Sequence, residues 1–269
     1  MSGPGPKSTA RLLAKSVFAA ADLVVRDRPG PRILIYHQVG AGLGRQMEVS
    51  EQQFSRQIDW VQANGDVASL GPAIDDRARE GVERTFVLTF DDGYRDVFER
   101  AWPLLRDRGL PFTLYVTTNP VESGVPLTAG GAADPLTWPQ INEMLESGLM
   151  TLGAHTHTHP DLTAIDAGTI REEIERSNEL ILLRTGVEAR HFTYPWGYWS
   201  RVADPVVREA YDTATLGSGQ GITAGTDPYL VNRIPVQLSD GFTFFKRKMK
   251  GGMRLEDVVR RRLTGYRGP

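Results

Sequence analysis

Residues 86–93 read FVLTFDDG, an uncharged run that ends in two adjacent carboxylates and a glycine. Short runs of aromatic and β-branched residues without charge are typical of strands buried on both faces. Gly93 allows the backbone to turn sharply directly after such a strand. The segment therefore predicts a buried strand that presents Asp91 and Asp92 at its C-terminal end.

Three further runs have the same character, and helical segments separate them. The predicted strands are 32–36, 112–116 and 150–153, and the predicted helices are 54–63, 97–108, 138–147 and 167–185. Strands that alternate with helices over about 200 residues indicate an α/β protein with a parallel sheet, which we expect to close into a barrel. In such barrels the functional side chains follow the C-terminal ends of the strands.

We expect a single domain over residues 30–269, because the sequence contains no internal repeat and no low-complexity linker. Residues 1–29 predict an N-terminal helical extension, in which apolar side chains share one face and Lys15 lies mostly elsewhere. This pattern indicates a helix packed on the domain; a helix on a membrane surface and an uncleaved export signal are the alternatives. The basic segment 246–267 predicts a solvated helix face, with contact to an anionic surface as the alternative.

Composition excludes several classes of protein. The 269 residues include 31 Lys and Arg and 33 Asp and Glu, which gives a net charge of −2. This charge disfavours binding to nucleic acid through the overall charge of the protein. Cysteine is absent, so thiolate metal sites and cysteine nucleophiles are excluded. No apolar run approaches the ~18–20 residues that a membrane span needs. Because the sequence shows no clear signal peptide, we expect a cytoplasmic or peripheral membrane location, with export as the alternative.

The chain has only 5 histidines, so any metal chemistry draws on a short set. They are His37, His155, His157, His159 and His191. His155 and His159 lie four residues apart after a predicted strand and can bind one ion if the segment between them turns tightly. Two imidazoles and one carboxylate leave coordination positions open, as a hydrolytic metal site requires.

Each of these features also has a purely structural interpretation. The sequence Asp-Asp-Gly is common in turns, and His155 and His159 can be ordinary loop residues, as we expect His157 to be. His37 can be a buried imidazole that is hydrogen-bonded to the backbone. Their occurrence together, at the ends of successive predicted strands, favours a catalytic site over coincidence.

Three motifs connect the chain to a known family. Residues 89–93 (TFDDG) and 155–160 (HTHTHP) resemble the first two motifs of the polysaccharide deacetylases, the carbohydrate esterases with NodB homology. Residues 192–197 (FTYPWG) resemble the third motif. The match covers most of the chain after Arg32. The resemblance implies a distorted (β/α)₇ barrel.

The resemblance also implies roles for these residues. Asp92, His155 and His159 would bind one divalent metal ion, for which we expect Zn²⁺, with Co²⁺ and Ni²⁺ as alternatives. Asp91 would be the general base. The backbone N–H of Trp196 would bind the oxyanion.

The chain departs from the family pattern in two places, and the first concerns the partner of the base. Many members carry an arginine directly after the phenylalanine of the third motif, where it orients the catalytic aspartate. This chain has Thr193 at that position, and Arg233 is our candidate for the replacement.

The general acid is the second departure. Family members usually place this histidine near the C-terminus, but no histidine follows His191. Residues 35–39 (IYHQV) resemble the subgroup that acts on poly-β-1,6-N-acetylglucosamine, in which an early Tyr-His strand supplies the acid. We therefore expect His37 to be the general acid, with His191 as the alternative.

The implied function is metal-dependent removal of N-acetyl groups from amino sugars in a polysaccharide or glycoconjugate, with release of acetate. The predicted contacts to the glycan are Tyr94, Tyr194, Trp199 and Arg233, with Trp196 and Tyr198 as further stacking surfaces. An N-acetylated glycan is the expected partner, nucleic acid is not, and the N-terminal helix could contact a membrane surface. The alternatives are an amidohydrolase of the same fold that cleaves a non-sugar amide or cyclic imide, and a non-catalytic glycan-binding protein. The second would need neither the base, the acid nor the metal ligands.

Overall fold

The computed structural model describes residues 15–16, 30–79, 82–127, 133–217 and 221–263. Its strands are β1 (Arg32–Tyr36), β2 (Gln38–Val39), β3 (Glu48–Val49), β4 (Asp66–Val67), β5 (Thr85–Phe90), β6 (Phe112–Val116), β7 (Met150–Ala154), β8 (His191–Thr193), β9 (Thr213–Leu216), β10 (Val231–Asn232) and β11 (Ile234–Pro235). Its α-helices are α2 (Glu51–Asn64), α3 (Leu70–Asp75), α4 (Trp102–Asp107), α5 (Thr118–Ser123), α6 (Trp138–Glu146), α7 (Ala167–Thr185), α8 (Ala203–Ala210), α9 (Gly241–Met249) and α10 (Arg254–Leu263).

The strands and helices predicted from the sequence are confirmed, with shifts of a few residues at their ends. The predicted helix 97–108 begins as a π-helical turn (Val97–Ala101) and continues as α4. The sequence analysis missed β8 to β11, because strands of two to four residues are too short to show a pattern.

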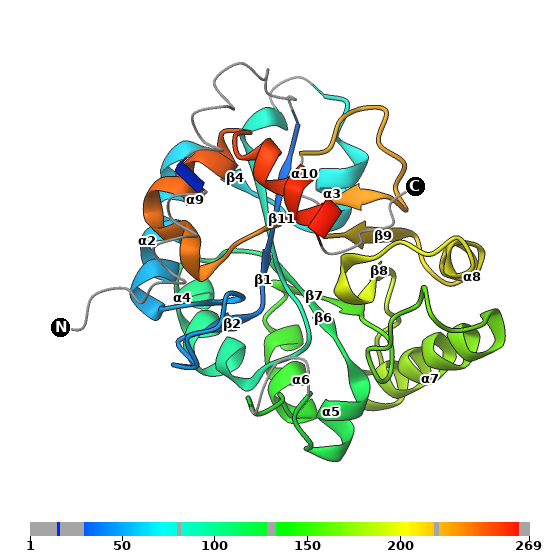
Figure 1. Cartoon of the computed structure of the whole chain (residues 1–269). Helices are drawn as coiled ribbons and strands as arrows, with labels where there is room; N and C mark the ends of the chain where they lie inside the picture. The colour runs from blue at the N-terminus through cyan, green and yellow to red at the C-terminus, as the bar shows by residue number, and fades with distance from the viewer. Residues whose placement is uncertain (1–14, 17–29, 80–81, 128–132, 218–220, 264–269) are drawn as a thin grey trace.

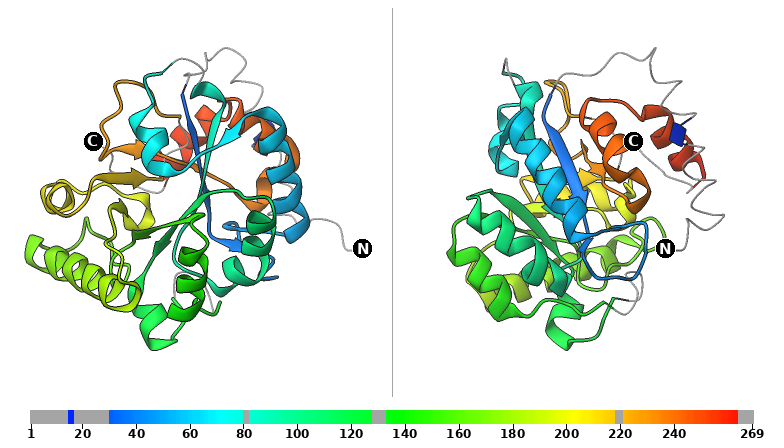
Figure 2. Two further views of the ribbon diagram at one scale, coloured as in Figure 1. Left: turned by 180° about the vertical axis from the view of Figure 1, so that it is seen from behind. Right: turned by 90° about the vertical axis from the view of Figure 1, so that its left-hand side faces the viewer.

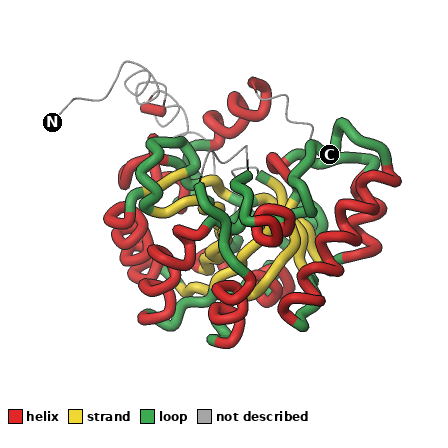
Figure 3. The backbone as a smooth tube through the Cα atoms, turned by 90° about the horizontal axis from the view of Figure 1, so that it is seen from below, coloured by secondary structure: helices red, strands yellow, loops and turns green. Residues whose placement is uncertain are grey.

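The central strands pair in parallel, in the order β10–β9–β8–β7–β6–β5–β1–β11. β10 and β11 flank Arg233 in one continuous segment, yet they pair with opposite edges of the sheet, β9 and β1. Segment 231–235 therefore closes the sheet into a ring of seven strand positions, and the predicted distorted (β/α)₇ barrel is confirmed. Figure 1 shows the strands at the centre, and Figures 2 and 3 show the helices around them from other sides.

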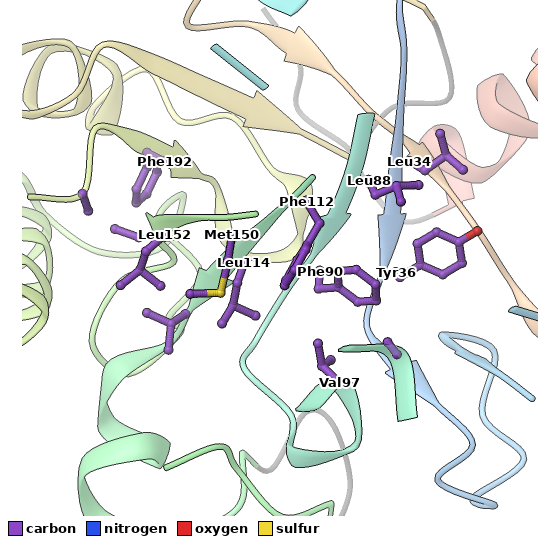
Figure 4. Close-up of a cluster of buried hydrophobic side chains, with 14 of the residues drawn as sticks. Leu34, Tyr36, Leu88, Phe90, Val97, Phe112, Leu114, Met150, Leu152 and Phe192 are labelled. Carbon is purple, nitrogen blue, oxygen red and sulfur yellow. The ribbon is translucent and has the colours of Figure 1, made fainter. Parts of the chain in front are cut away.

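Alternate residues of the strands pack in two layers. Leu34, Tyr36, Leu88 and Phe90 belong to the layer between the strands and the surrounding helices (Figure 4). The rings of Tyr36 and Phe90 stack there with centroids 5.5 Å apart. Intervening residues such as Val87 pack in a second cluster, together with side chains of α3. Because both faces of these strands are buried, their sequences are mostly apolar and do not alternate between polar and apolar residues.

The same alternation directs the end of β5 into the barrel. Side chains two residues apart on a strand share a face, so Thr89 and Asp91 fall on the face of Val87. Arg233 likewise shares the face of Val231, which belongs to the same cluster as Val87. Asp91, at the end of β5, and Arg233, from the segment that closes the sheet, thus meet inside the ring.

The N-terminal extension contacts the domain through Lys15, which is buried. Its ammonium group lies 2.6 Å from a carboxylate oxygen of Asp240 and also pairs with Glu256 of α10. Figure 2 shows this short segment beside α10. Lys15 was expected off the packed face, but buried carboxylates compensate its charge. The remaining residues of the predicted helix, and the membrane contact proposed for them, lie outside the described residues.

The basic C-terminal segment is less solvated than the sequence suggests. Lys248 of α9 is buried, lies 2.8 Å from Asp240 and donates to the carbonyl oxygen of Pro235 at 3.0 Å. A lysine that is paired and hydrogen-bonded in this way can be buried. Within the part of the chain that the structure describes, no helix is both long and apolar enough to cross a membrane.

Candidate active site

A cavity of about 560 Å³ lies at the C-terminal ends of the barrel strands. Its lining includes nine of the ten predicted site residues: His37, Asp91, Asp92, Tyr94, His155, His159, Tyr194, Trp196 and Arg233. These residues come from five parts of the chain, which parallel strands bring to one end of the barrel. The tenth predicted residue, Trp199, is not part of the lining.

Asp91 is held by Arg233, which comes from the segment that closes the barrel. Both guanidinium NH groups donate to the two carboxylate oxygens of Asp91, at 2.7 Å each. They also donate to the hydroxyl oxygens of Thr89 (2.9 Å) and Thr193 (2.6 Å). The guanidinium carbon lies 5.0 Å from the centre of the Tyr115 ring. Arg233 is therefore fixed in position by two hydroxyls, one ring and the carboxylate itself.

This pairing determines the charge of Asp91. Burial by itself would raise the pKa of the carboxyl group, but the adjacent Arg233 guanidinium brings the pKa below its ordinary value. Asp91 is consequently an ionised carboxylate at neutral pH and can accept a proton. The geometry agrees with the predicted replacement of the third-motif arginine by Arg233, with Thr193 as one of its acceptors. The predicted glycan contact of Arg233 does not fit, because the side chain is 1% exposed and its two terminal NH₂ groups are engaged.

Asp92, His155 and His159 form a cluster in which one potential ligand atom from each lies within 4.8 Å of the others. The Nε2 atoms of His155 and His159 lie 3.4 and 3.5 Å from Oδ1 of Asp92. That oxygen is buried and has no hydrogen-bond partner among the described residues. Two imidazole nitrogens and one carboxylate oxygen are a common ligand set for a catalytic zinc ion. The residues present therefore fit a divalent metal ion.

The two histidine rings are oriented by different means. Nδ1 of His155 lies 2.8 Å from the carbonyl oxygen of Thr193, so it carries the proton and leaves Nε2 free to bind a metal. Burial, together with the neighbouring His155 ring, lowers the pKa of His159 to about 4. The ring of His159 is therefore neutral at pH 7, as a metal ligand must be. It packs edge-on against the rings of His155 and Trp196.

Unusual backbone conformations gather at this site. Among the described residues, five that are not glycine have a positive φ, and four of these belong to the site: Asp92, Thr156, His159 and Trp196. A left-handed conformation costs an L-residue about 1 kcal/mol or more. Strain of this kind is typical of functional sites, where the surrounding structure enforces a special geometry.

His37 and Trp196 complete the predicted machinery. His37 follows β1, and its Nδ1 atom is buried without a hydrogen-bond partner in the described segments. Trp196 lies on a 3₁₀ turn (Pro195–Gly197), and its side chain is 52% exposed. The turn approaches Gly217 so closely that a Cβ atom on Gly197 would lie 2.7 Å from the Gly217 Cα. This close approach explains the glycine in the third motif.

The predicted aromatic contacts to a glycan fit less well. Tyr94 is 3% exposed; burial and its hydrogen bond to Asp92 raise the pKa of its hydroxyl group. It therefore supports Asp92 rather than presenting a ring face. Tyr194 is fully buried and packs against Phe192, and the indole nitrogen of Trp199 donates to Asp204 at 3.1 Å.

One wall of the cavity was missed by the sequence analysis. Gln38 and residues 44–47 line it, among them Arg45 and Met47. The paired strands β2 and β3 carry this loop, and the backbone N–H of Leu238 binds its Gln46 carbonyl at 2.8 Å. Strands of two residues and a loop without a motif leave no signal that sequence reasoning could have used.

The two remaining histidines have structural contacts. Nδ1 of His157 lies 2.9 Å from the hydroxyl of Thr118, outside the metal-ligand cluster, as expected. His191 contacts the hydroxyl of Thr213 at 2.8 Å and does not line the cavity. This leaves His37 as the cavity histidine outside the metal-ligand cluster.

Known proteins share these features. The family model of polysaccharide deacetylases matches residues 78–213. The chain is 26% identical over 207 residues to YxkH of Bacillus subtilis, covering 75% of this chain and 66% of that protein. It is 26% identical over 162 residues to a poly-beta-1,6-N-acetyl-D-glucosamine N-deacetylase of Staphylococcus epidermidis, covering 55% of this chain and 54% of that protein. The chain thus spans just under two thirds and about half of the length of these relatives.

Solved structures show the same fold. IcaB from Ammonifex degensii superposes with a TM-score of 0.68 at 22% sequence identity, over 83% of this chain and 98% of that one. The family match spans half of the present chain and contains Asp91, Asp92, His155 and His159. This chain belongs to the polysaccharide deacetylase family.

Proposed function

We propose that this protein hydrolyses the N-acetyl groups of amino sugars in a polysaccharide or glycoconjugate, releasing acetate and a free amine. The observation that carries the proposal is one cavity that joins an ionised buried carboxylate, Asp91, to a metal-ligand cluster of Asp92, His155 and His159. A binding protein would need neither feature. Amide hydrolysis needs both a base for the attacking water and an electrophile for the carbonyl.

The metal ion that we propose is Zn²⁺, since neutral histidine nitrogens and one carboxylate are ligands that zinc accepts. When bound, it would act as a Lewis acid toward the acetamide carbonyl and the attacking water. Asp91 accepts a proton from this water as its oxygen adds to the carbonyl carbon. Arg233 keeps the Asp91 carboxylate ionised and oriented for that step.

The negative charge that develops on the carbonyl oxygen also needs a donor. We assign the backbone N–H of Trp196 to this role, because Trp196 lines the cavity and its ring contacts His159. His37 then donates a proton to the sugar nitrogen as the C–N bond breaks. Its position in the lining, directly after β1, which pairs with β5, supports this assignment.

The name of the Staphylococcus epidermidis relative suggests a β-1,6-linked N-acetylglucosamine polymer as the substrate to test first. The test measures acetate release by the Zn²⁺-loaded protein from β-1,6- and β-1,4-linked N-acetylglucosamine oligomers. A non-sugar acetamide and a cyclic imide serve as comparison substrates, and Asp91→Asn is the inactive control.

Acetate from the oligomers that depends on Asp91 supports the proposal. Ring opening of the imide without acetate release would favour the amidohydrolase alternative. Oligomer binding without any hydrolysis would identify a glycan-binding protein instead.

A further inference from the structure

His155 and His159 differ in what holds them. The His155 ring donates from Nδ1 to the Thr193 carbonyl, and this bond fixes the orientation of the ring. Nδ1 of His159 has no hydrogen-bond partner among the described residues. The backbone N–H of His159 instead donates to the hydroxyl oxygen of Thr156 at 3.0 Å. The position of His159 therefore depends on the backbone of segment 155–159.

Glu173 of α7 binds this backbone between the two histidines. Its Oε2 atom accepts hydrogen bonds from the consecutive N–H groups of His157 (2.9 Å) and Thr158 (2.8 Å). Its Oε1 atom accepts a third from the hydroxyl of Thr158 at 2.7 Å. One carboxylate thus hydrogen-bonds with both residues that precede His159.

The opposite side of the segment is held by the backbone that follows β6. The N–H of Asn119 donates to the His157 carbonyl at 2.9 Å, and the N–H of Thr118 donates to the Thr156 carbonyl at 3.3 Å. These bonds hold carbonyl groups, whereas Glu173 holds the N–H groups. Thr156 and His159 both have a φ of 62°, so the segment needs contacts on both sides to keep this conformation.

We propose that Glu173 is the positioning residue for His159: its carboxylate holds the loop so that the His159 Nε2 atom meets His155 and Asp92. Partners one step removed from a metal ion typically change its affinity 10- to 100-fold when they are removed. The inference rests on Asp92, His155 and His159 being the metal site of the proposed function.

The test is the affinity of Glu173→Ala for Zn²⁺, measured by competition with a chromophoric chelator. We expect a 10- to 100-fold weaker affinity than in the wild type. The visible absorption of the Co²⁺-loaded protein should also change, because it reports the ligands and geometry of the ion. A role limited to folding would lower the melting temperature of the metal-free protein and leave affinity and spectrum unchanged.

Matched variants sharpen this test. Glu172→Ala removes the adjacent, exposed carboxylate of the same helix and should bind Zn²⁺ like the wild type. Glu173→Gln should recover most of the affinity, because its amide oxygen can still accept the two backbone N–H bonds. In a His159→Ala background, Glu173→Ala should weaken binding no further, since the ligand that it positions is already gone.

Wild-type affinity in Glu173→Ala would overturn the inference, and so would a full additional loss in the His159→Ala background. If the wild-type protein itself binds no divalent metal ion, the proposed function fails, whatever the variants do. The two failures are therefore distinguishable.

Discussion

The proposed base and the proposed metal ligands share one cavity, but the chain positions them in different ways. Arg233 and Asp91 are 142 residues apart in sequence and meet only because segment 231–235 closes the barrel. Segment 155–159 carries two of the proposed metal ligands and two left-handed residues, and Glu173, 16 residues from His157, binds its backbone. The proposed base thus depends on closure of the barrel, whereas the proposed ligand His159 depends on the conformation of the loop that carries it. Changes in the two regions should separate protonation effects from metal-binding effects.

The largest expected effect comes from removing the proposed metal ligands. The wild-type protein should hold about one divalent ion per chain. The double variant His155→Ala/His159→Ala lacks two of the three proposed ligands, so its metal content should fall to zero. Activity should be lost with the metal. Elemental analysis of the purified protein measures this, and stoichiometric, tightly held metal in the double variant would contradict the assignment.

Replacing the proposed base should abolish turnover and leave the metal content unchanged. In Asp91→Asn the amide has nearly the shape of the carboxylate but cannot accept the proton of the attacking water. Asp92→Asn should instead lose the ion. The measurement is metal content alongside acetate release. If Asp91→Asn loses metal while Asp92→Asn keeps it, the two roles are exchanged.

His37 is expected to act after the base, on the leaving amine. His37→Ala should lower kcat by ~10²–10⁴ with unchanged metal content, as is typical for loss of a general acid. A kcat close to the wild-type value would assign the role to another group.

Removing Arg233 tests whether the closed barrel sets the charge of the base. In the wild type the pKa of Asp91 is lowered, so its contribution to stability is present above the pKa of the unfolded chain. This contribution is lost as the pH falls through the lower folded value. In Arg233→Met burial remains without the cation, so the Asp91 pKa should rise.

The acid limb of the pH–rate profile should then move to higher pH in Arg233→Met. The free energy of unfolding at neutral pH should fall by about 3–5 kcal/mol, because a buried charge is left unpaired. Chemical denaturation measures the second effect. An unchanged acid limb would mean that Arg233 does not control the charge of Asp91.

The smallest effect should come from the histidine between the two ligands. His157 contacts the Thr118 hydroxyl and lies outside the metal-ligand cluster, so His157→Ala should keep its metal and most of its activity. Loss of the ion in this variant would show that segment 155–159 binds metal in a different arrangement.

Local sequence determined much of this protein. Strands such as 86–90 and 112–116 are buried on both faces, so every residue carries the signal and the sequence predicts them directly. The cluster was predictable too: position after two such strands indicated two histidines and one carboxylate, and the resemblance to the deacetylase motifs selected Asp92, His155 and His159. The short strands β8 to β11 were not predictable, because two to four residues are too few to show a hydrophobic periodicity.

Tertiary structure decided the contacts that join distant parts of the chain. The sequence named Arg233 as a candidate partner of Asp91, but only closure of the barrel brings the two within 2.7 Å and buries both. The loop 44–47 reaches the cavity through pairing that no motif encodes, and Tyr194 and Trp199 turn into packing contacts rather than ring faces for a sugar. The physical reason is that residue type and spacing specify local conformation, whereas burial and charge pairing depend on which distant segments the fold brings together.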